Sequence, residues 1–135
     1  MRVVTRYWML GQRICAFTVD RNPLPKQRPR VIKRKGKSIA FTPRKTKQYE
    51  TYVASLARKA MGDREPTTEL VAVRLVFYRA RRTADVDNLV KGCLDPMQGI
   101  IYKNDNQVVD LHAQWFRDKE NPHAYVEVWE VTGGS

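Results

Sequence analysis

The chain has 135 residues, and its 25 Lys and Arg against 14 Asp and Glu give a net charge of +11 at pH 7. A hydrophobic fraction of 42% excludes a wholly disordered basic tail, and two Cys exclude a disulfide framework. No apolar run reaches the roughly 18 residues of a membrane span, and the arginine-interrupted N-terminus is unlike a secretory signal. We therefore expect one soluble, cytoplasmic domain that contacts no membrane.

The positive charge is concentrated in the first part of the chain. Residues 1–50 hold 14 basic and 2 acidic side chains, whereas residues 51–135 hold 11 and 12. Lys and Arg that neutralise phosphates release counterions, so this asymmetry favours a nucleic acid partner over a merely solvated basic surface. The cations expected to contact the phosphate backbone, without reading base sequence, are Lys26, Arg28, Arg30, Lys33, Arg34, Lys35, Lys37, Arg44, Lys45, Lys47, Arg81 and Arg82.

The first predicted elements are extended. Residues 13–20 alternate between apolar and polar side chains and predict a strand. The segment 22–30 contains three prolines, so we expect it to be extended or turning rather than helical. Residues 30–41 predict a basic hairpin with Gly36 near its turn.

A helix is predicted next. We expect Thr42 to cap it, Pro43 to be its first residue and Gly62 to end it. Between these ends, apolar side chains recur at three- and four-residue steps and form one stripe: Tyr49, Tyr52, Val53, Leu56, Ala57 and Ala60. Cations in the first turns oppose the helix macrodipole, which favours an anion nearby.

The rest of the chain predicts a second helix among further strands. The helix is expected over residues 87–101. The strands are expected over 69–79, 107–117 and 124–131. This order predicts an α/β or α+β fold, a single domain with a mixed sheet flanked by helices. We expect an N-terminal extension, the domain and a flexible tail over 1–12, 13–131 and 132–135.

Acidic residues cluster after the strand predicted over 69–79. Asp85 and Asp87 are two residues apart, so an extended segment points both carboxylates the same way. Lys91 and Asp95 follow at four-residue steps on one helix face, and Asp105 lies in a polar turn before the next strand. If the helix and its loop reverse the chain, Asp105 returns to the edge that holds the first two acids. The sequence thus predicts three carboxylates that converge at one point.

Converging carboxylates fit Mg²⁺, which takes one or two of them together with water and substrate phosphate. Such an ion lowers the pKa of a bound water and stabilises the leaving oxygen in phosphodiester hydrolysis. We therefore predict Mg²⁺, or Mn²⁺ in its place, on Asp85, Asp87 and Asp105, with Lys91 offsetting charge in the transition state. No nucleotide cofactor is expected, because the chain has no Gly-rich phosphate loop.

Several of these residues also have a purely structural interpretation. Asp87 could cap the helix and pair with Lys91, and Asp105 is an ordinary turn residue. Three further polar side chains are expected to hold the ligands in place: Asn88, Asp95 and Gln107. The remaining candidates for chemistry are assigned to the core, a strand end or a dimer interface: Cys15, Cys93, His112, His123, Trp115 and Trp129.

The acidic motifs resemble those of a known family. DVDNLVK at 85–91 with Leu94 and Asp95, followed by NDNQV at 104–108, is similar to the RusA-type Holliday junction resolvases, a group of bacterial and phage endodeoxyribonucleases. The segment PKQRPR at 25–30 also resembles that family, and the likeness spans roughly residues 13–130. In two places the chain departs from the family. Asn104 stands where members often carry a second acid, and Pro96 is expected to kink or end the helix near Asp95.

The resemblance implies a homodimeric, Mg²⁺-dependent nuclease of RusA-like fold that cuts paired strands symmetrically at a four-way DNA junction. Its catalytic residues would be Asp85, Asp87, Lys91 and Asp105. Two other functions stay open. One is a less selective branched-DNA or flap nuclease with the same site, and the other is a non-catalytic basic module that binds DNA or RNA. Mg²⁺-dependent cleavage separates the enzymes from the binding module.

Overall fold

The computed structural model describes residues 5–27 and 29–134, and its main feature is a four-stranded mixed sheet in the order β1–β6–β4–β5. The strands are β1 (Trp8–Val19), β4 (Val71–Arg79), β5 (Val108–Arg117) and β6 (His123–Gly133). β6 runs antiparallel to both β1 and β4, whereas β4 and β5 are parallel. A parallel pair needs a crossover, which is supplied by α2 (Val86–Met97) and the 3₁₀ helix η1 (Asp105–Gln107).

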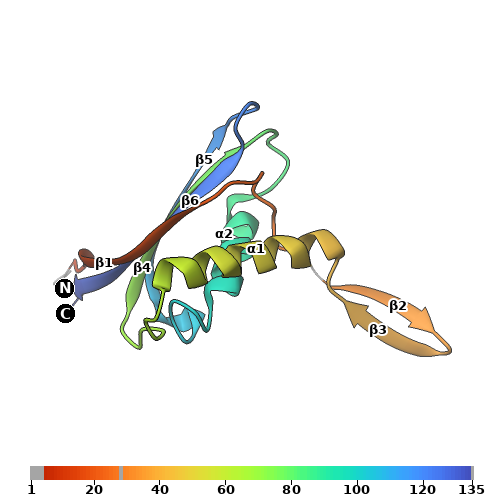
Figure 1. Ribbon diagram of the computed structural model, residues 1–135, viewed down its shortest axis with the longest axis horizontal. Helices are drawn as coiled ribbons and strands as arrows, with labels where there is room; N and C mark the ends of the chain where they lie inside the picture. The colour runs from red at the N-terminus through yellow and green to blue at the C-terminus, as the bar shows by residue number, and fades with distance from the viewer. Residues whose placement is uncertain (1–4, 28, 135) are drawn as a thin grey trace, which may run out of the picture.

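Helices α1 (Arg44–Met61) and α2 lie on one face of the sheet (Figure 1). The apolar stripe of α1 faces the sheet, because Tyr49, Val53 and Ala57 are buried there. The predicted fold class, a mixed α+β domain with helices packed on the sheet, is confirmed. Neither helix in the described part of the chain is long and apolar enough to span a membrane.

The ends of both helices differ from the prediction. Pro43 holds the N-cap position at φ −54° and ψ 142°, so the prediction that Thr42 caps the helix is wrong by one residue. The buried Pro43 carbonyl accepts a hydrogen bond from the Lys47 amide at 3.1 Å, which closes the first turn. Gly62 ends α1 as predicted, with φ 59°. α2 ends at Met97 rather than at residue 101: Pro96 lies in its last turn, Gln98 has extended backbone and Gly99 has φ 85°.

The strands nearest the two termini, β1 and β6, are longer than predicted. β1 begins at Trp8, and Trp8 pairs with Gly133 at the end of β6. The division of the chain into an extension, a domain and a tail stays a prediction.

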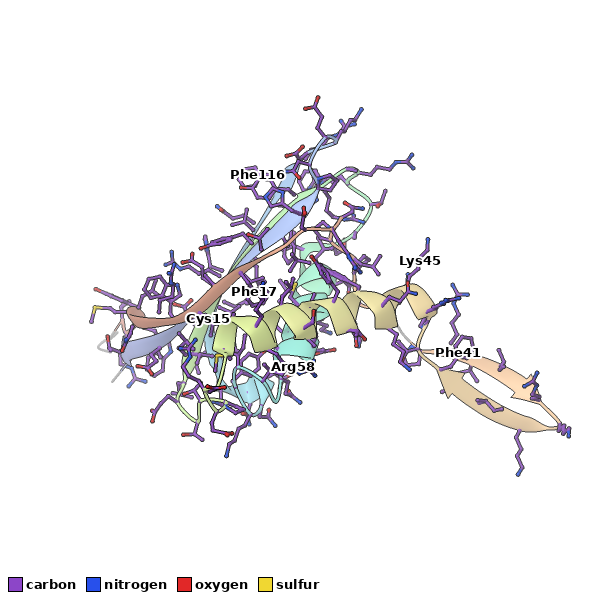
Figure 2. The ribbon with its side chains drawn as sticks, viewed as in Figure 1. Cys15, Phe17, Phe41, Lys45, Arg58 and Phe116 are labelled. Carbon is purple, nitrogen blue, oxygen red and sulfur yellow. The ribbon has the colours of Figure 1, made fainter. Side chains whose placement is uncertain are left out.

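The predicted basic hairpin is confirmed. β2 (Arg30–Arg34) and β3 (Lys37–Phe41) form a separate two-stranded sheet that extends away from the body (Figure 1). Lys35 and Gly36 connect the strands at φ 51° and 74°, the left-handed pair that two-residue hairpin turns favour. Figure 2 shows Phe41 at the base of this hairpin and Lys45 on the start of α1.

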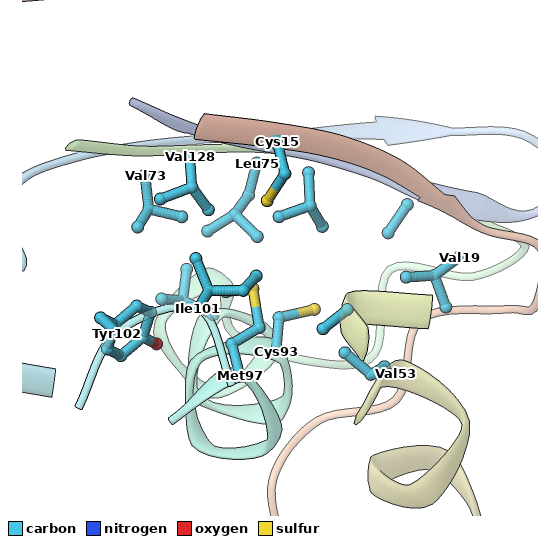
Figure 3. Close-up of a cluster of buried hydrophobic side chains, with 14 of the residues drawn as sticks. Cys15, Val19, Val53, Val73, Leu75, Cys93, Met97, Ile101, Tyr102 and Val128 are labelled. Carbon is cyan, nitrogen blue, oxygen red and sulfur yellow. The ribbon is translucent and has the colours of Figure 1, made fainter. Parts of the chain in front are cut away.

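The core lies between the sheet and the helical layer. Figure 3 shows side chains of the sheet, among them Val73, Leu75 and Val128, facing those of α2 and the loop after it. Met97, Ile101 and Tyr102 are fully buried in this layer. Burial of one such side chain stabilises the fold by about 1.5–3 kcal/mol, so this cluster is the main source of stability.

The proline-rich segment before the hairpin contacts both helices. The Lys26 amide donates to the Asn88 carbonyl of α2 at 2.9 Å. The Leu24 carbonyl lies so close to Gly92 that a Cβ there would be 2.6 Å from its oxygen, and only glycine permits this approach. The Lys26 ammonium bonds the Glu50 carboxylate of α1 and, at 3.3 Å, that of Asp95. These contacts fix residues Leu24–Lys26 of the segment against α2.

Candidate active site

Two carboxylates stand at the start of α2. Asp85 holds the N-cap position with extended backbone, and Asp87 lies in the first turn. Both residues are exposed, and Asp85 makes no side-chain capping hydrogen bond. The ion pairs between described residues are formed by other groups: Arg13–Glu127, Lys26–Glu50 and Lys26–Asp95. Since the cap position belongs to Asp85, the structural interpretation of Asp87 as the cap is not supported.

Lys91 lies one turn after Asp87 on α2 and is also exposed. Residues four apart share a helix face, so the ammonium and the Asp87 carboxylate emerge on the same side of α2. They form no ion pair among the contacts of the described residues. The start of α2 therefore presents two anions and one cation to solvent, close to helix N–H groups that attract phosphate oxygens.

The loop that leads to Asp85 is organised by Arg79, the buried last residue of β4. Its guanidinium donates to the Pro23 carbonyl at 3.0 Å, and to the Arg81 carbonyl and the Thr83 hydroxyl at 3.2 Å each. Burial lowers the pKa of this guanidinium, but an arginine stays charged at any ordinary pH. Sequence reasoning missed Arg79; the available signal was an arginine at the end of an otherwise apolar strand.

Asp105 is presented by a rigid turn at η1. Asn104 caps this turn, because its side chain accepts from the Asn106 amide at 3.0 Å. The Asp105 amide donates to the Gln98 side chain at 3.0 Å, and Gln98 is the C-cap of α2. The Asp105 residue itself is exposed. The departure at Asn104 thus has a structural reason: an amide in place of a second acid caps the turn.

Gln107 holds this turn from the inside. Its side-chain oxygen accepts from the amides of Lys103 and Asn104 at 2.9 Å each. Its side-chain nitrogen donates to the carbonyls of Thr67 and Glu69 at 2.8 Å each. Gln107 is buried. The side chain therefore holds the backbone of the turn that carries Asp105, and its support of a metal ligand stays a prediction.

Asp105 lies at the opposite end of α2 from Asp85 and Asp87, because its amide bonds the side chain of the C-cap residue Gln98. Thirteen residues separate Asp85 from Gln98, which corresponds to about 20 Å along a helix axis. The charge of Asp105 acts instead on Tyr102, whose pKa is raised by burial first and then by Asp105 and Asp95. The described residues contain no group of three or more His, Cys, Asp or Glu that could hold a metal ion. The structure therefore holds Asp105 apart from the acidic pair of its own chain, and a metal site that uses all three acids stays a prediction.

The start of α2 fits a divalent cation only in part. Mg²⁺ is often held by one or two carboxylates plus water and substrate phosphate, a minimum that Asp85 and Asp87 meet. Oxygen ligands of Mg²⁺ and Ca²⁺ lie within about 2.6 Å of the ion, so no single ion reaches both ends of α2. Asp105 cannot join the pair without a second chain.

The predicted phosphate-binding cations lie mostly on one basic surface, the hairpin and the first turns of α1. This basic surface consists of the exposed residues Arg30, Lys33, Arg34, Lys35, Lys37, Arg44, Lys45 and Lys47. Sequence reasoning missed Arg21, which lies 3.8 Å from the centre of the Tyr52 ring and lines an open groove with Arg44 and Lys47. A phosphate backbone that follows α1 would pass these three cations.

The other predicted cations have different surroundings. Lys26 is half-buried and bonded to Glu50 and Asp95. Desolvation lowers its pKa, but the two carboxylates outweigh that effect and raise it above the ordinary value. Arg82 lies over the Trp115 ring at 5.4 Å, beside the exposed Arg81. The predicted contact at position 28 lies outside the described residues.

Two predicted supporting residues are tied to this segment. The Asn88 carbonyl and the Asp95 carboxylate both bind Lys26, so they fix the proline-rich segment against α2. The Asp95 contact is on the α2 side that faces this segment. These contacts give both residues a structural role, Asn88 next to the acidic pair and Asp95 in the last turn of α2.

Comparison with known proteins identifies the family. The family model described as Endodeoxyribonuclease RusA matches residues 20–129, a range that includes both acidic motifs. Uncharacterized protein YqaN of Bacillus subtilis (strain 168) is 33% identical over 141 residues, which cover 86% of this chain and 96% of that protein.

Proposed function

The chain belongs to the RusA family of endodeoxyribonucleases, and we propose that it is a cytoplasmic, Mg²⁺-dependent enzyme that resolves four-way DNA junctions. It acts as a homodimer and cuts two opposing strands symmetrically. The observation that carries this proposal is the start of α2, where Asp85 and Asp87 are exposed without an internal ion-pair partner among described residues. Unpaired carboxylates in a strongly basic protein repel DNA unless a cation neutralises them.

The residues at the start of α2 have different roles in phosphodiester hydrolysis. Asp85 and Asp87 would hold Mg²⁺, which when bound supplies an activated water and neutralises negative charge. Lys91 is placed to offset the charge that develops on the phosphate or on the leaving oxygen. Arg79 fixes the loop before Asp85 and so keeps the pair in one geometry. The basic surface positions the phosphate backbone without reading sequence.

A second copy of the chain gives Asp105 its place in this site. Its carboxylate is held outward on a capped turn, about one helix length from the pair of its own chain. A twofold dimer can bring the Asp105 turn of one protomer to the start of α2 of the other, and it does so twice. Two such shared sites match a junction that is cut on two strands.

The first experiment tests the reaction. The protein is incubated with a synthetic four-way junction or a linear duplex of the same sequence, with Mg²⁺ or EDTA. We expect symmetric nicks on opposing arms of the junction only with Mg²⁺. Asp87→Asn should abolish cleavage and leave junction binding unchanged or tighter, because a repulsive charge is gone. Asp63→Asn, at an exposed turn after α1, is the matched control and should cleave normally.

Two results would contradict this function. Binding without metal-dependent cleavage would favour the non-catalytic module. Equal cleavage of flaps, nicked duplex and junctions would favour a less selective branched-DNA nuclease.

The second experiment tests the shared site by mixing inactive chains. One carries Asp85→Asn and Asp87→Asn, and the other carries Asp105→Asn. A mixed dimer then has one intact site, formed by the pair of one chain and Asp105 of the other. We expect the mixture to nick one strand of the junction without paired cleavage, whereas each variant alone is inactive. No recovery on mixing, with dimers confirmed by light scattering, would show that Asp105 is not shared.

A further inference from the structure

The hairpin formed by β2 and β3 is an arm rather than part of the body. All ten residues of its strands are exposed, and the two strands contact each other far more than any other element. A lone two-stranded hairpin is marginally stable in water, so a binding partner is needed to stabilise its strands. Residues 30–41 contain five Lys and Arg and no Asp or Glu, so that partner is a polyanion.

The two faces of this arm differ in chemistry. Arg30 pairs with Phe41, Ile32 with Ile39, and Arg34 with Lys37. Directly opposed residues point to the same side, and side chains alternate along a strand, so all six share one face. This face, which we term the wedge face, has an apolar centre between cations at its base and its tip. The exposed fractions of Ile32, Ile39 and Phe41 are 45%, 43% and 41%.

The arm follows a segment that is anchored next to the acidic pair. The Lys26 amide, four residues before the hairpin, bonds the Asn88 carbonyl next to Asp87. At about 3.4 Å per residue, each strand spans roughly 17 Å, the height of about five stacked base pairs. DNA cleaved at the start of α2 therefore has its branch within reach of the arm.

We propose that the hairpin inserts at the branch point of a DNA junction and stacks its wedge face on the base pairs exposed there. This inference rests on the proposed function and names the part of the chain that separates branched from linear DNA. Apolar side chains unstack base steps in other DNA-bending proteins, and a branch already exposes base faces, so insertion costs less there than in duplex DNA. Arg30, Arg34 and Lys37 hold the flanking phosphates.

Two other occupants of the arm fit less well. A ribbon that reads the major groove needs side chains for base edges, but the hairpin has no Asn or Gln and its centre is apolar. A second copy of the arm would bring five cations against five. Unpaired base faces framed by phosphates satisfy both the apolar centre and the cationic rim.

The test measures binding in EDTA, where no cleavage occurs. A triple variant, Ile32→Thr, Ile39→Thr and Phe41→Thr, keeps the charge and the strand propensity but removes the apolar centre. Val31→Thr, on the opposite face of the same strand, is the matched control. Each protein is titrated into a four-way junction with 2-aminopurine at the branch, and into linear duplex at the same salt. Thermal unfolding checks that the body is intact, and its midpoint should not move.

We expect the triple variant to lose about tenfold or more in junction affinity and to bind duplex as the parent does. The 2-aminopurine fluorescence, which rises when the base unstacks, should increase with the parent and with Val31→Thr but not with the triple variant. Unchanged junction affinity, or an equal loss on junction and duplex, would overturn the wedge. Failure of the parent to cleave with Mg²⁺ would overturn the proposed nuclease but not this binding result.

Discussion

Removal of the Arg79 guanidinium tests how the fold positions the acidic pair. Its three hydrogen bonds join β4 to the proline-rich segment and to the loop before Asp85. Arg79→Met leaves the carbonyl of the buried Pro23 without a donor, which costs about 1–3 kcal/mol, whereas water replaces the two bonds nearer the surface at about 0.5–1 kcal/mol each. We expect a total loss of about 2–5 kcal/mol in urea unfolding. Arg79→Lys, which keeps one donor group, should lose about half as much.

The same variant should reduce catalysis more than binding. A misplacement of about 1 Å in a catalytic group lowers a rate on the order of 100-fold, so kcat for junction cleavage should fall while junction affinity stays within a few-fold. Arg74→Met, on the exposed face of the same strand, is the matched control for both measurements. If Arg79→Met is as stable and as active as Arg74→Met, Arg79 does not position the site. An equal loss of affinity and rate would instead indicate a direct DNA contact.

Two further predictions concern the interior. Gly92→Ala should destabilise the fold by about 1–3 kcal/mol in thermal unfolding, because its Cβ would meet the Leu24 carbonyl oxygen at 2.6 Å. This clash outweighs the helix propensity of Ala, which favours Ala over Gly by about 1 kcal/mol. A gain in stability would contradict this packing. Burial raises the thiol pKa of Cys15 to about 11 and of Cys93 to about 12. Both thiols should therefore resist a disulfide reagent at pH 8 until unfolding. The free energy of unfolding should fall as the pH rises above about 9, where only the unfolded chain releases these thiol protons. Rapid reaction of either thiol with the reagent in the folded protein would refute the burial.

Local patterns account for the elements that the sequence predicted correctly. Gly36 identified the hairpin turn because only a left-handed pair of residues joins two strands so tightly. The stripe through Tyr49 and Val53 identified the buried face of α1 because helical periodicity reports burial. Gly62 identified the end of the same helix. Each of these features depends on residues within a few positions of one another.

Contacts between distant residues had no such local signal. Lys26 reads as one more cation in a basic segment, but Glu50 and Asp95, 24 and 69 positions away, engage it. From the sequence alone, Gly92 is only a residue that lowers the stability of a helix. In the structure, the Leu24 carbonyl occupies the space that a side chain would fill. Arg79 reads as the polar end of a strand. Their roles follow from the path of the proline-rich segment over α2, which chain spacing does not reveal.

The separation of Asp105 from the other acids has a topological cause. The prediction of convergence required the chain to return to the sheet edge that it had left. Because β4 and β5 are parallel, the chain leaves β4 at its C-terminal end. It must enter β5 at the N-terminal end, which lies at the opposite end of the strands. Asp85 follows the end of β4, and Asp105 precedes the start of β5, so α2 necessarily holds them apart. A proposed site that uses all three carboxylates in this fold therefore needs the Asp105 turn of a second chain.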